Sequence, residues 1–354
     1  MKGLVLSGGK GTRLRPLTYT GAKQLVPLAN KPVLFYVLED LVAAGITDIG
    51  IVVGDTADQI QAAVRDGSAF GATVTYIRQD RPGGLAHAVR TARPWLCDER
   101  FVMYLGDNFI QGGIARYVDA FRDSTAAAHV LLYRVPNPQD FGVVEVVDGR
   151  IVGLEEKPPV PRSDLALVGI YLFDHRIHEA TETIEPSWRG ELEITDAIRR
   201  LLEMGLEVRP HVLDGWFIDT GKMEDMLDAN RLVLQEVRRR ISGMVADDCT
   251  VQGNVIVEEG AVVLNSTLRG PLIIGEGTRI EGAYIGPFTA IGPHCVVRDS
   301  EIEHTIVMGR SQITDVPHRI EDSLIGCDVT VSRSRAQPRA YKMMLGDHSK
   351  VGIL

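Results

Sequence analysis

Short apolar runs alternate with amphipathic segments along the chain up to about residue 240. Apolar runs bounded by turn residues are typical of strands that are buried on both faces of a sheet. The clearest runs are Lys2–Ser7, Ile49–Val53, Val74–Ile77, Phe101–Leu105 and Val130–Val135. Between the first two, Pro32–Ala44 carries apolar residues at helical spacing and is followed by Gly45, which favours a helix end. This alternation predicts an α/β fold, a Rossmann-like and mostly parallel sheet with helices on both faces.

Two later segments depart from that alternation. Val143–Val147 and Ile151–Leu154 flank Asp148-Gly149, which predicts a hairpin inserted into the α/β core. Lys222–Ile241 is predicted to be a long amphipathic helix that closes this half of the chain. We interpret the three arginines at its end, residues 238–240, as a solvated helix terminus and not as a nucleic-acid patch.

Beyond residue 247 the helical period disappears, and aliphatic residues recur in steps of 6, 6 and 5, so that the pattern returns every 17 residues. The positions are Val251, Val257, Val263, Leu268, Ile274, Ile280, Ile285, Ile291, Val297 and Ile302. One inward aliphatic residue per side predicts a three-sided parallel β-helix. The phase slips after Ile302, so we expect the remaining residues to cap the solenoid. The predicted domains are therefore 1–240, and 247–354 with an irregular C-terminal cap.

Charge and composition narrow the possible partners. The 354 residues include 38 Lys and Arg against 47 Asp and Glu, a net charge of −9. This balance argues against general binding to nucleic acid or to an anionic membrane, so a polyanion would need a locally basic pocket or a metal ion. The four cysteines are widely spaced and include no C-x-x-C pair, which predicts free thiols. No apolar stretch has the length of a membrane span or a secretory leader, so we expect a soluble, cytoplasmic protein.

The segment that follows the first predicted strand combines glycine with positive charge. Gly8, Gly9 and Gly11 allow the backbone N–H groups to approach an anion closely. It is not a P-loop, because Lys10 is followed by glycine and not by Ser or Thr. Arg13 and Arg15 follow at once, and Lys23 and Lys31 come later in the same segment. Such a cluster of positive charge beside a backbone nest suits a triphosphate.

Two aspartates are candidate metal ligands. Asp107 follows the strand Phe101–Leu105, and Asp219 lies in the later sequence Trp216–Gly221. Ligands of open α/β sheets collect beyond the carboxyl ends of the strands. Mg²⁺ takes one or two carboxylates together with substrate phosphates. As a pair with a phosphate loop upstream, the two aspartates predict an Mg²⁺ site.

These residues carry a resemblance to the sugar-1-phosphate nucleotidylyltransferase family, over essentially the first 240 residues. The matching motifs are G-G-x-G-T-R-L-x-P-L-T at 8–18, K-Q-L-x-P at 23–27, G-D-N at 106–108, F-G-V-V at 141–144, E-E-K-P at 155–158, R-G-E-L-E-I-T-D at 189–196 and W-x-x-D-T-G at 216–221. Within that family the chain is most similar to the glucose-1-phosphate thymidylyltransferases, of which a long form carries a left-handed β-helix tail.

The resemblance implies that dTTP and glucose 1-phosphate react, with Mg²⁺, to give dTDP-glucose and pyrophosphate. The residues implied to bind the nucleotide are Gly8, Gly9, Gly11, Thr12, Arg13, Gln79, Gly84 and Asp107. Among these, Gln79 and Gly84 would read the pyrimidine edge. Lys23 would neutralise the departing pyrophosphate, and Asp107 and Asp219 would hold the metal.

The resemblance also implies a site for the sugar phosphate. Its residues would be Gly142, Glu156, Lys157, Leu167, Tyr171 and Arg189. Lys157 and Arg189 would grip the phosphate, and the other four would contact sugar hydroxyls. Arg13, Lys23 and Lys157 are the residues implied to carry catalysis. Glu191 and Glu193 either orient Arg189 or cap the following helix; the sequence leaves both open.

Two residues depart from the family pattern: Ser7, where many relatives have Ala, and Leu167, where the short form usually has Val. Transfer from UTP or a purine nucleotide, or to another sugar or cyclitol phosphate, is an alternative. A non-catalytic sensor or scaffold is an alternative of a different class, but it would be expected to lose the charged residues that are present here. The flat faces of a solenoid favour self-association, so we expect a homo-oligomer.

Overall fold

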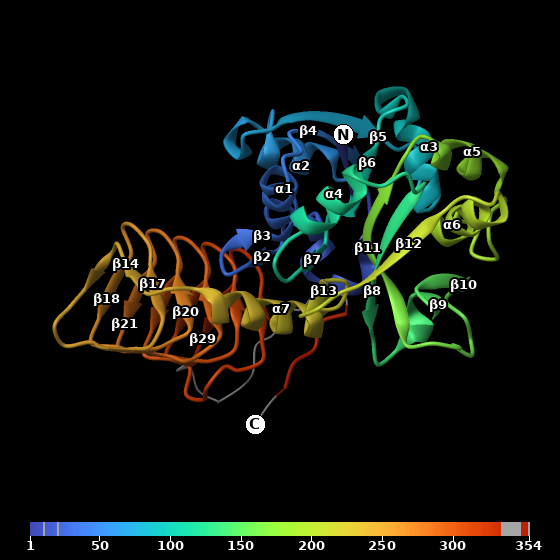
Figure 1. The fold of residues 1–354 in the computed structure, drawn as a ribbon. Coiled ribbons are helices and arrows are strands. Elements are labelled where there is room, and N and C mark those ends of the chain that lie inside the picture. Colours follow the sequence, from blue (N-terminus) through green and yellow to red (C-terminus); the bar gives the residue numbers. More distant parts are fainter. Residues whose placement is uncertain (10, 20, 334–347, 353–354) are drawn as a thin grey trace. The chain divides into compact units, whose positions relative to one another are not determined.

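The computed structural model of the chain describes residues 1–9, 11–19, 21–333 and 348–352. The chain divides into two compact units, whose elements are labelled in Figure 1. The first unit comprises Met1–Lys10, Gly21–Leu25 and Val33–Asp219. The second comprises Gly11–Thr20, Val26–Pro32 and Thr220–Leu354. Two short N-terminal segments are thus grouped with the C-terminal part of the chain.

The first unit is built on a sheet whose central strands are parallel. β1 (Lys2–Ser7) pairs in parallel with β4 (Asp48–Val53) and β6 (Phe101–Leu105), and β4 pairs in parallel with β5 (Thr73–Arg78). β11 (Leu165–Phe173), in which every residue is buried, runs antiparallel to β6. The N-terminal end of β11 therefore lies at the same sheet edge as the C-terminal end of β6.

The predicted hairpin extends this sheet. β9 (Gly142–Val147) and β10 (Arg150–Glu156) are antiparallel, and β9 also pairs with β11. Asp148 and Gly149 have φ values of 49° and 75°, the left-handed values that a two-residue hairpin turn needs. On another side β11 pairs with β8 (Ala128–Arg134), which pairs in parallel with β12 (Val208–Val212).

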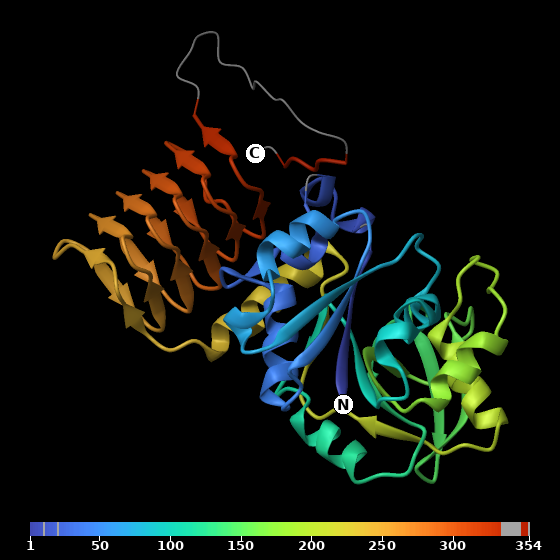
Figure 2. The same ribbon diagram turned by 90° about the horizontal axis from the view of Figure 1, so that it is seen from above.

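Helices pack on both faces of the sheet, as the strand–helix alternation predicts (Figure 2). One face is covered by α3 (Leu85–Leu96), α5 (Arg176–Thr183) and α6 (Ile194–Glu203). The other is covered by α1 (Val33–Ala43), α2 (Ala57–Val64) and α4 (Ala115–Arg122). In α1 the predicted apolar face is buried, and Gly45 follows with φ 75°. Short elements complete the described part: η1 (Thr12–Leu14), η2 (Leu17–Tyr19), β2 (Pro27–Leu28), β3 (Lys31–Pro32), η4 (Ser68–Phe70) and η5 (Pro138–Asp140).

The second unit contains the predicted parallel β-helix. One sheet stacks β14 (Arg240–Ile241), β17 (Val255–Val257), β20 (Leu272–Ile274), β23 (Thr289–Ile291), β26 (Ile306–Val307) and β28 (Leu324–Ile325). Another stacks β15 (Met244–Val245), β18 (Val262–Leu264), β21 (Arg279–Glu281), β24 (Val296–Arg298), β27 (Gln312–Thr314) and β29 (Thr330–Ser332). The third stacks β16 (Thr250–Gln252), β19 (Thr267–Arg269), β22 (Tyr284–Ile285) and β25 (Glu301–Ile302).

Between residues 250 and 302, paired residues in these sheets are 17 positions apart, as the period in the sequence predicts. Val251, Leu268, Ile285 and Ile302 are successive partners along one side, and the other two sides follow the same rule. After Ile302 the phase slips as predicted, but the sheets continue, since β26 to β29 still pair with the preceding coil. The solenoid absorbs the slip with coils of different length. Of the rest of the predicted cap, residues 334–347 and 353–354 lie outside the described residues.

Two sequence predictions were wrong in their details. The helix predicted over Lys222–Ile241 is α7 (Met223–Glu236), and the last of the three arginines begins β14, which pairs with β17. The arginines are exposed, but they are not a helix terminus. β5 is not buried on both faces: its residues are exposed or half-buried, because it is the last strand at one edge of the sheet.

A buried amide ties α7 to its neighbours within the second unit. The backbone N–H of Ala29 donates to Asn230 Oδ1 at 2.9 Å, and Asn230 Nδ2 donates to the carbonyl of Phe288 at 3.0 Å. Asn30 Nδ2 donates to the carbonyl of Ile291 at 2.8 Å. The β2–β3 turn and α7 are thereby fixed to the solenoid coils. Among the described residues, no helix combines the length and apolarity needed to cross a membrane.

Candidate functional site

The glycine-rich loop after β1 is closely packed by two side chains of the first unit. A Cβ at Gly8 would lie 3.2 Å from Gln79 Oε1, and a Cβ at Gly9 would lie 3.2 Å from Lys23 Cε. Because Gly8 and Gly9 have no side chains, Gln79 and Lys23 can lie directly against their backbone. Lys23 lies in η3 (Lys23–Leu25), and its ammonium forms an ion pair with Asp107. The loop, Lys23 and Asp107 thus come together at the carboxyl end of the parallel strands.

The two predicted metal ligands come from a second, short sheet. β7 (Asn108–Ile110) follows Asp107 directly and pairs antiparallel with β13 (Phe217–Asp219), which sets Asp219 opposite Asn108. Asn108 is buried; its Nδ2 donates to Asp219 Oδ1 at 3.3 Å, and its Oδ1 accepts from the N–H of Gly169 at 3.1 Å. A Cβ at Gly169 would collide with that oxygen, so the glycine is required for Asn108 to stay in place.

This arrangement fits a divalent cation whose remaining ligands come from the substrate. Asp219 pairs with Asn108, the residue next to Asp107. The two aspartates therefore supply carboxylate oxygens, and Mg²⁺ usually takes one or two carboxylates from a protein. Among the described residues, no group of three or more His, Cys, Asp or Glu side chains could hold a metal without further ligands. The Lys23 ammonium already pairs with the Asp107 carboxylate, so a cation at Asp107 would share that carboxylate with Lys23.

The residues predicted to read the base lie on the loop between β5 and α3. Gln79 Nε2 lies 2.8 Å from His87 Nδ1, and no motif in the sequence links His87 to this loop. Gly84 has φ 96°, and a Cβ there would lie 2.4 Å from the carbonyl oxygen of Leu192. The backbone of Leu192 also bonds on both sides of Gly84, to Gly83 O at 2.8 Å and Ala86 N at 3.0 Å. Glycine at position 84 is therefore required by the backbone contact itself.

Three of the predicted sugar-site residues, Gly142, Glu156 and Leu167, lie together at one end of the sheet. Gly142 is the register partner of Glu156, and a Cβ there would lie 3.2 Å from both Glu156 Oε2 and Leu167 Cδ1. Thr195 Oγ1 donates to Glu156 Oε2 at 3.2 Å. Burial, and then the charge of the nearby Glu156, raises the pKa of Tyr171. Its hydroxyl therefore keeps its proton and can act as a hydrogen-bond donor.

Arg189 is held by three carboxylates. It lies 3.2 Å from Glu191, 3.4 Å from Glu193 and 3.6 Å from Glu156. Glu193 precedes α6 but makes no capping hydrogen bond through its side chain, so of the two open alternatives it orients Arg189. Burial raises the pKa of both Glu156 and Glu193, and for Glu156 the charge of Glu193 adds to the effect. An anionic ligand near Arg189 would have to compete with these carboxylates.

The other predicted phosphate ligands differ in what surrounds them. Lys157 has φ 44°, and its backbone N–H donates to the carbonyl of Phe141 at 3.0 Å, so the turn after β10 is closed on the hairpin. Gly11 has φ 60° and precedes the η1 turn that contains Thr12 and Arg13. Its carbonyl accepts from Thr18 Oγ1 at 2.5 Å. Gly11, Thr12 and Arg13 are grouped with the second unit, and their contact with a nucleotide stays a prediction.

Two buried polar atoms beside the glycine loop have no hydrogen-bond partner among the described residues: Ser7 Oγ and Gln24 Oε1. Ser7 is fully buried. The Gln24 side chain packs against Gly106, just ahead of Asp107. Buried polar groups normally find partners, so unpaired ones here are consistent with a site completed by a polar ligand.

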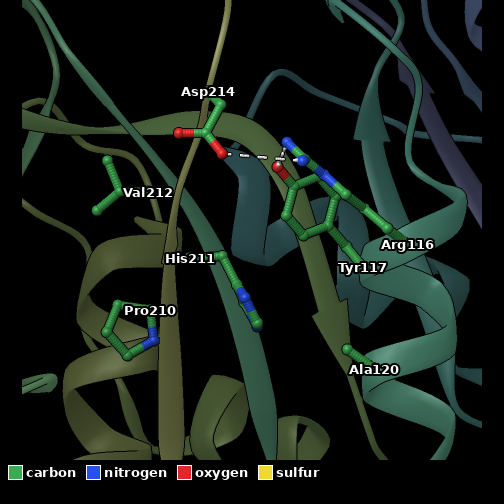
Figure 3. A pocket seen from close by; sticks show the side chains of 7 residues that line it. All are labelled: Arg116, Tyr117, Ala120, Pro210, His211, Val212 and Asp214. Carbon is green, nitrogen blue, oxygen red and sulfur yellow. Dashed lines mark hydrogen bonds and ion pairs between the residues drawn. The ribbon is translucent and has the colours of Figure 1, made fainter.

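A separate cavity of about 380 Å³ lies between α4 and the segment around β12 (Figure 3). It is lined by Arg116, Tyr117, Ala120, Pro210, His211, Val212 and Asp214. Arg116 faces Asp214 across it, at 3.9 Å. None of these residues belongs to the predicted site, and no motif in the sequence indicated the cavity.

Comparison with known proteins decides the family. A family model described as nucleotidyl transferase matches residues 2–236. The chain belongs to the nucleotidyl transferase family. It is 56% identical to a glucose-1-phosphate thymidylyltransferase of Streptomyces antibioticus, over 100% of this chain and 99% of that one. A second glucose-1-phosphate thymidylyltransferase, of Streptomyces griseus, is 55% identical with the same coverage.

A solved structure agrees with this membership. It is assigned as a glucose-1-phosphate thymidylyltransferase of Bacillus anthracis in complex with a sucrose, and it is 35% identical with a TM-score of 0.63. It covers 68% of this chain and 97% of its own. The similarity to full-length relatives, by contrast, extends over the whole nucleotidyl transferase chain, β-helix included.

Proposed function

We propose that this nucleotidyl transferase condenses dTTP and glucose 1-phosphate to dTDP-glucose and pyrophosphate. The proposal is carried by one observation: relatives bearing the name glucose-1-phosphate thymidylyltransferase are 55–56% identical over the full chain. The residues of the first unit that the resemblance implied for phosphate, base and sugar would supply the charges and hydrogen bonds that this reaction needs. Local contacts support the proposal: Lys23 lies beside Gly9 and Asp107, and Glu156 lies beside Gly142 and Arg189.

The nucleotide would be bound by backbone amides and by positive side chains. Gly8 and Gly9 would offer N–H groups to the phosphates, and Gly11, Thr12 and Arg13 would complete the loop. Lys23, already beside Gly9, would neutralise the pyrophosphate as it leaves. When the triphosphate binds, Lys23 would exchange part of its contact with Asp107 for phosphate oxygens.

Asp107 and Asp219 would hold Mg²⁺, with Asn108 fixing the Asp219 carboxylate by the hydrogen bond already described. Bound there, Mg²⁺ would supply positive charge that offsets the negative charge of the phosphates. Asp107 would therefore serve the metal and the Lys23 ammonium together. Mg²⁺ would be needed there because the cations of the first-unit site are paired with carboxylates: Lys23 with Asp107, and Arg189 with Glu156, Glu191 and Glu193.

On the sugar side, Glu156 would accept hydrogen bonds from hydroxyls, and Tyr171 would donate one. Lys157 and Arg189 would bind the phosphate of glucose 1-phosphate. An ionised phosphate oxygen attacks the α-phosphorus of dTTP in line; a new P–O bond forms as the bond to the β-phosphate oxygen breaks, and pyrophosphate leaves with that electron pair. No catalytic base is needed, because the attacking oxygen is already ionised at neutral pH. The residues contribute by positioning two anions and offsetting their charge.

The direct test is pyrophosphate release with Mg²⁺ and glucose 1-phosphate, with dTTP, UTP, ATP, GTP and CTP measured in parallel. A preference for dTTP supports the proposal. Preference for a purine nucleotide would keep the reaction type and contradict the assignment of Gln79 and Gly84. Absence of release with all five, while other sugar phosphates react, would contradict glucose 1-phosphate as the acceptor.

Two further proposals and one prediction concern the whole chain. We propose domain limits at 1–240 and 247–354, testable by limited proteolysis between them. We also propose a homo-oligomer, and a monomer mass by light scattering at micromolar concentration would contradict it. The cytoplasmic location expected from the sequence stays a prediction, which fractionation of cells that produce the chain can test.

A further inference from the structure

The amide of Gln79 is held by a short chain of side chains within the first unit. Its Nε2 lies 2.8 Å from Nδ1 of His87, in the first turn of α3. On the other side of the ring, His87 Nε2 lies 3.6 Å from Asp80 Oδ1. The Oε1 atom of the same amide lies beside Gly8, where a Cβ would be 3.2 Å away. The two ends of the amide therefore face different surroundings.

The packing around His87 leaves its ring little freedom. Its side chain is only 15% exposed, and a Cβ at Gly83 would lie 2.7 Å from the ring carbon Cγ. The backbone carbonyl of His87 accepts from Thr91 Oγ1 at 2.8 Å within α3. The absence of a side chain at Gly83 thus allows the ring to lie against the loop that carries Gln79.

The hydrogen-bond chemistry of the pair fixes the amide in one orientation. The Nε2 group of glutamine can only donate, and the His87 tautomer that accepts this bond at Nδ1 carries its proton on Nε2, the atom that lies 3.6 Å from Asp80 Oδ1. A rotated amide would bring Oε1 against the lone pair of Nδ1, which is unfavourable. With Nε2 engaged by His87, Oε1 is the atom left to accept a hydrogen bond from a ligand.

We infer that His87 is a positioning residue that makes Gln79 selective for bases carrying an N3–H group, as thymine and uracil do. An acceptor fixed at this place matches N3–H, whereas cytosine presents an unprotonated N3 and would face oxygen with a lone pair. The inference rests on the proposed function, because it takes Gln79 as the residue that reads the base. It adds the reason why that amide presents oxygen and not nitrogen.

The test compares two variants of nearly the same shape. Asn can place an oxygen acceptor where His87 has Nδ1, whereas Leu places a methyl group there. His87→Leu is expected to raise the KM for dTTP about tenfold and to narrow the ratio of kcat/KM between dTTP and CTP by a similar factor. The KM for glucose 1-phosphate should change less than about twofold. His87→Asn should restore most of both losses, and His87→Ala replaces His87→Leu if the latter does not fold.

A buried histidine elsewhere supplies the control. His178 on α5 is 4% exposed and bonds through Nε2 to the carbonyl of Cys97 at 3.0 Å. His178→Gln is expected to lower the melting temperature while leaving the dTTP-to-CTP ratio unchanged. If His87→Asn is as impaired as His87→Leu, or if His87→Leu keeps the wild-type KM and ratio, the inference is overturned.

Failure of the proposed function gives a different result. If the wild-type enzyme does not prefer dTTP over CTP, or if Gln79→Leu leaves the KM for dTTP unchanged, the base-reading role of Gln79 fails and the inference fails with it. If the wild type prefers dTTP and Gln79→Leu loses that preference while His87→Leu keeps it, only the role of His87 is wrong.

Discussion

The sequence specifies the β-helix sheets and the α/β sheet in different ways. In the β-helix, each coil repeats the one before it, so Ile280 stacks between Val263 and Val297 as an equivalent residue. In the α/β unit, the sheet edge breaks its own pattern at Gly142 and Gly169, where a side chain would collide with functional neighbours. Repetition marks the β-helix, whose buried residues supply stability. Local exceptions mark the part of the chain that contains the proposed site.

The largest effect we expect is on the chemical side of this comparison. Lys23→Ala removes the ammonium that lies beside Gly9 and Asp107, and should lower kcat/KM by about 10³-fold, or about 4 kcal/mol. Steady-state pyrophosphate release measures it. The control is Lys2→Ala: Lys2 lies at the opposite end of β1, and its Nζ donates to the carbonyl of Trp95 at 2.6 Å. That variant should keep kcat/KM within about twofold, and a Lys23→Ala enzyme within tenfold of wild type would contradict the assigned role.

The next largest effect we expect is a loss of stability in the β-helix that leaves catalytic activity unchanged. Ile280 is fully buried, so Ile280→Ala should lower the free energy of unfolding by about 3 kcal/mol through lost burial and a cavity. Urea denaturation gives the stability, and pyrophosphate release per folded molecule should stay near the wild-type value. Arg279→Ala, on the exposed side of the same strand, is the matched control and should change stability by less than about 0.5 kcal/mol. A large loss of kcat in folded Ile280→Ala would show that the two regions are not separable in this way.

These contrasts also explain what the sequence could reveal. The 17-residue period gave the register of Val251, Leu268 and Ile285 because each coil depends only on its neighbours. It could not give the coils after Ile302, where their lengths change and the sheets nevertheless continue. Family motifs supplied the site residues, but not the partners that hold them.

Those partners are distant in sequence. Asn108 reaches Asp219, and the Gly83–Ala86 loop bonds to Leu192, through contacts that no local pattern encodes. His87 was visible only as an isolated histidine, with no spacing that linked it to Gln79. Knowing that β11 reverses direction beside β6 would have indicated that Leu167 reaches the same edge as Asp107.

A pH effect on stability should arise in the α/β unit, away from the predicted site. His129 is 1% exposed, and its Nδ1 lies 3.0 Å from His211 Nε2. Burial, and then the positive charges of His211 and Arg209, lowers the pKa of His129 to about 4. The folded protein therefore binds this proton less readily than the unfolded chain. Stability is fully present above pH 6.5 and is lost as the pH falls toward 4, by at most about 3 kcal/mol.

Urea midpoints at pH 7.5 and pH 5 measure this loss. His129→Gln removes the titrating group, so its midpoint should fall less over the same interval, even if the variant is less stable at both pH values. Parallel pH dependence in the variant and the wild type would assign the acid sensitivity to other groups.

The smallest effect we expect is a change at the proposed site that alters the KM for glucose 1-phosphate but not the KM for dTTP. Lys157 lies in the turn after β10, and its φ of 44° comes with a backbone hydrogen bond to Phe141, which a substitution of the side chain leaves available. Lys157→Ala should raise the KM for glucose 1-phosphate about tenfold, since one charged contact to the phosphate is lost, while the KM for dTTP stays within about twofold. Arg162→Ala, whose guanidinium pairs with Glu145 at 3.8 Å on the same hairpin, is a charge-matched control that should change neither. Equal loss for both substrates would contradict a role confined to the sugar phosphate. Lys157 would then stabilise the negative charge of the transition state, to which both substrates contribute.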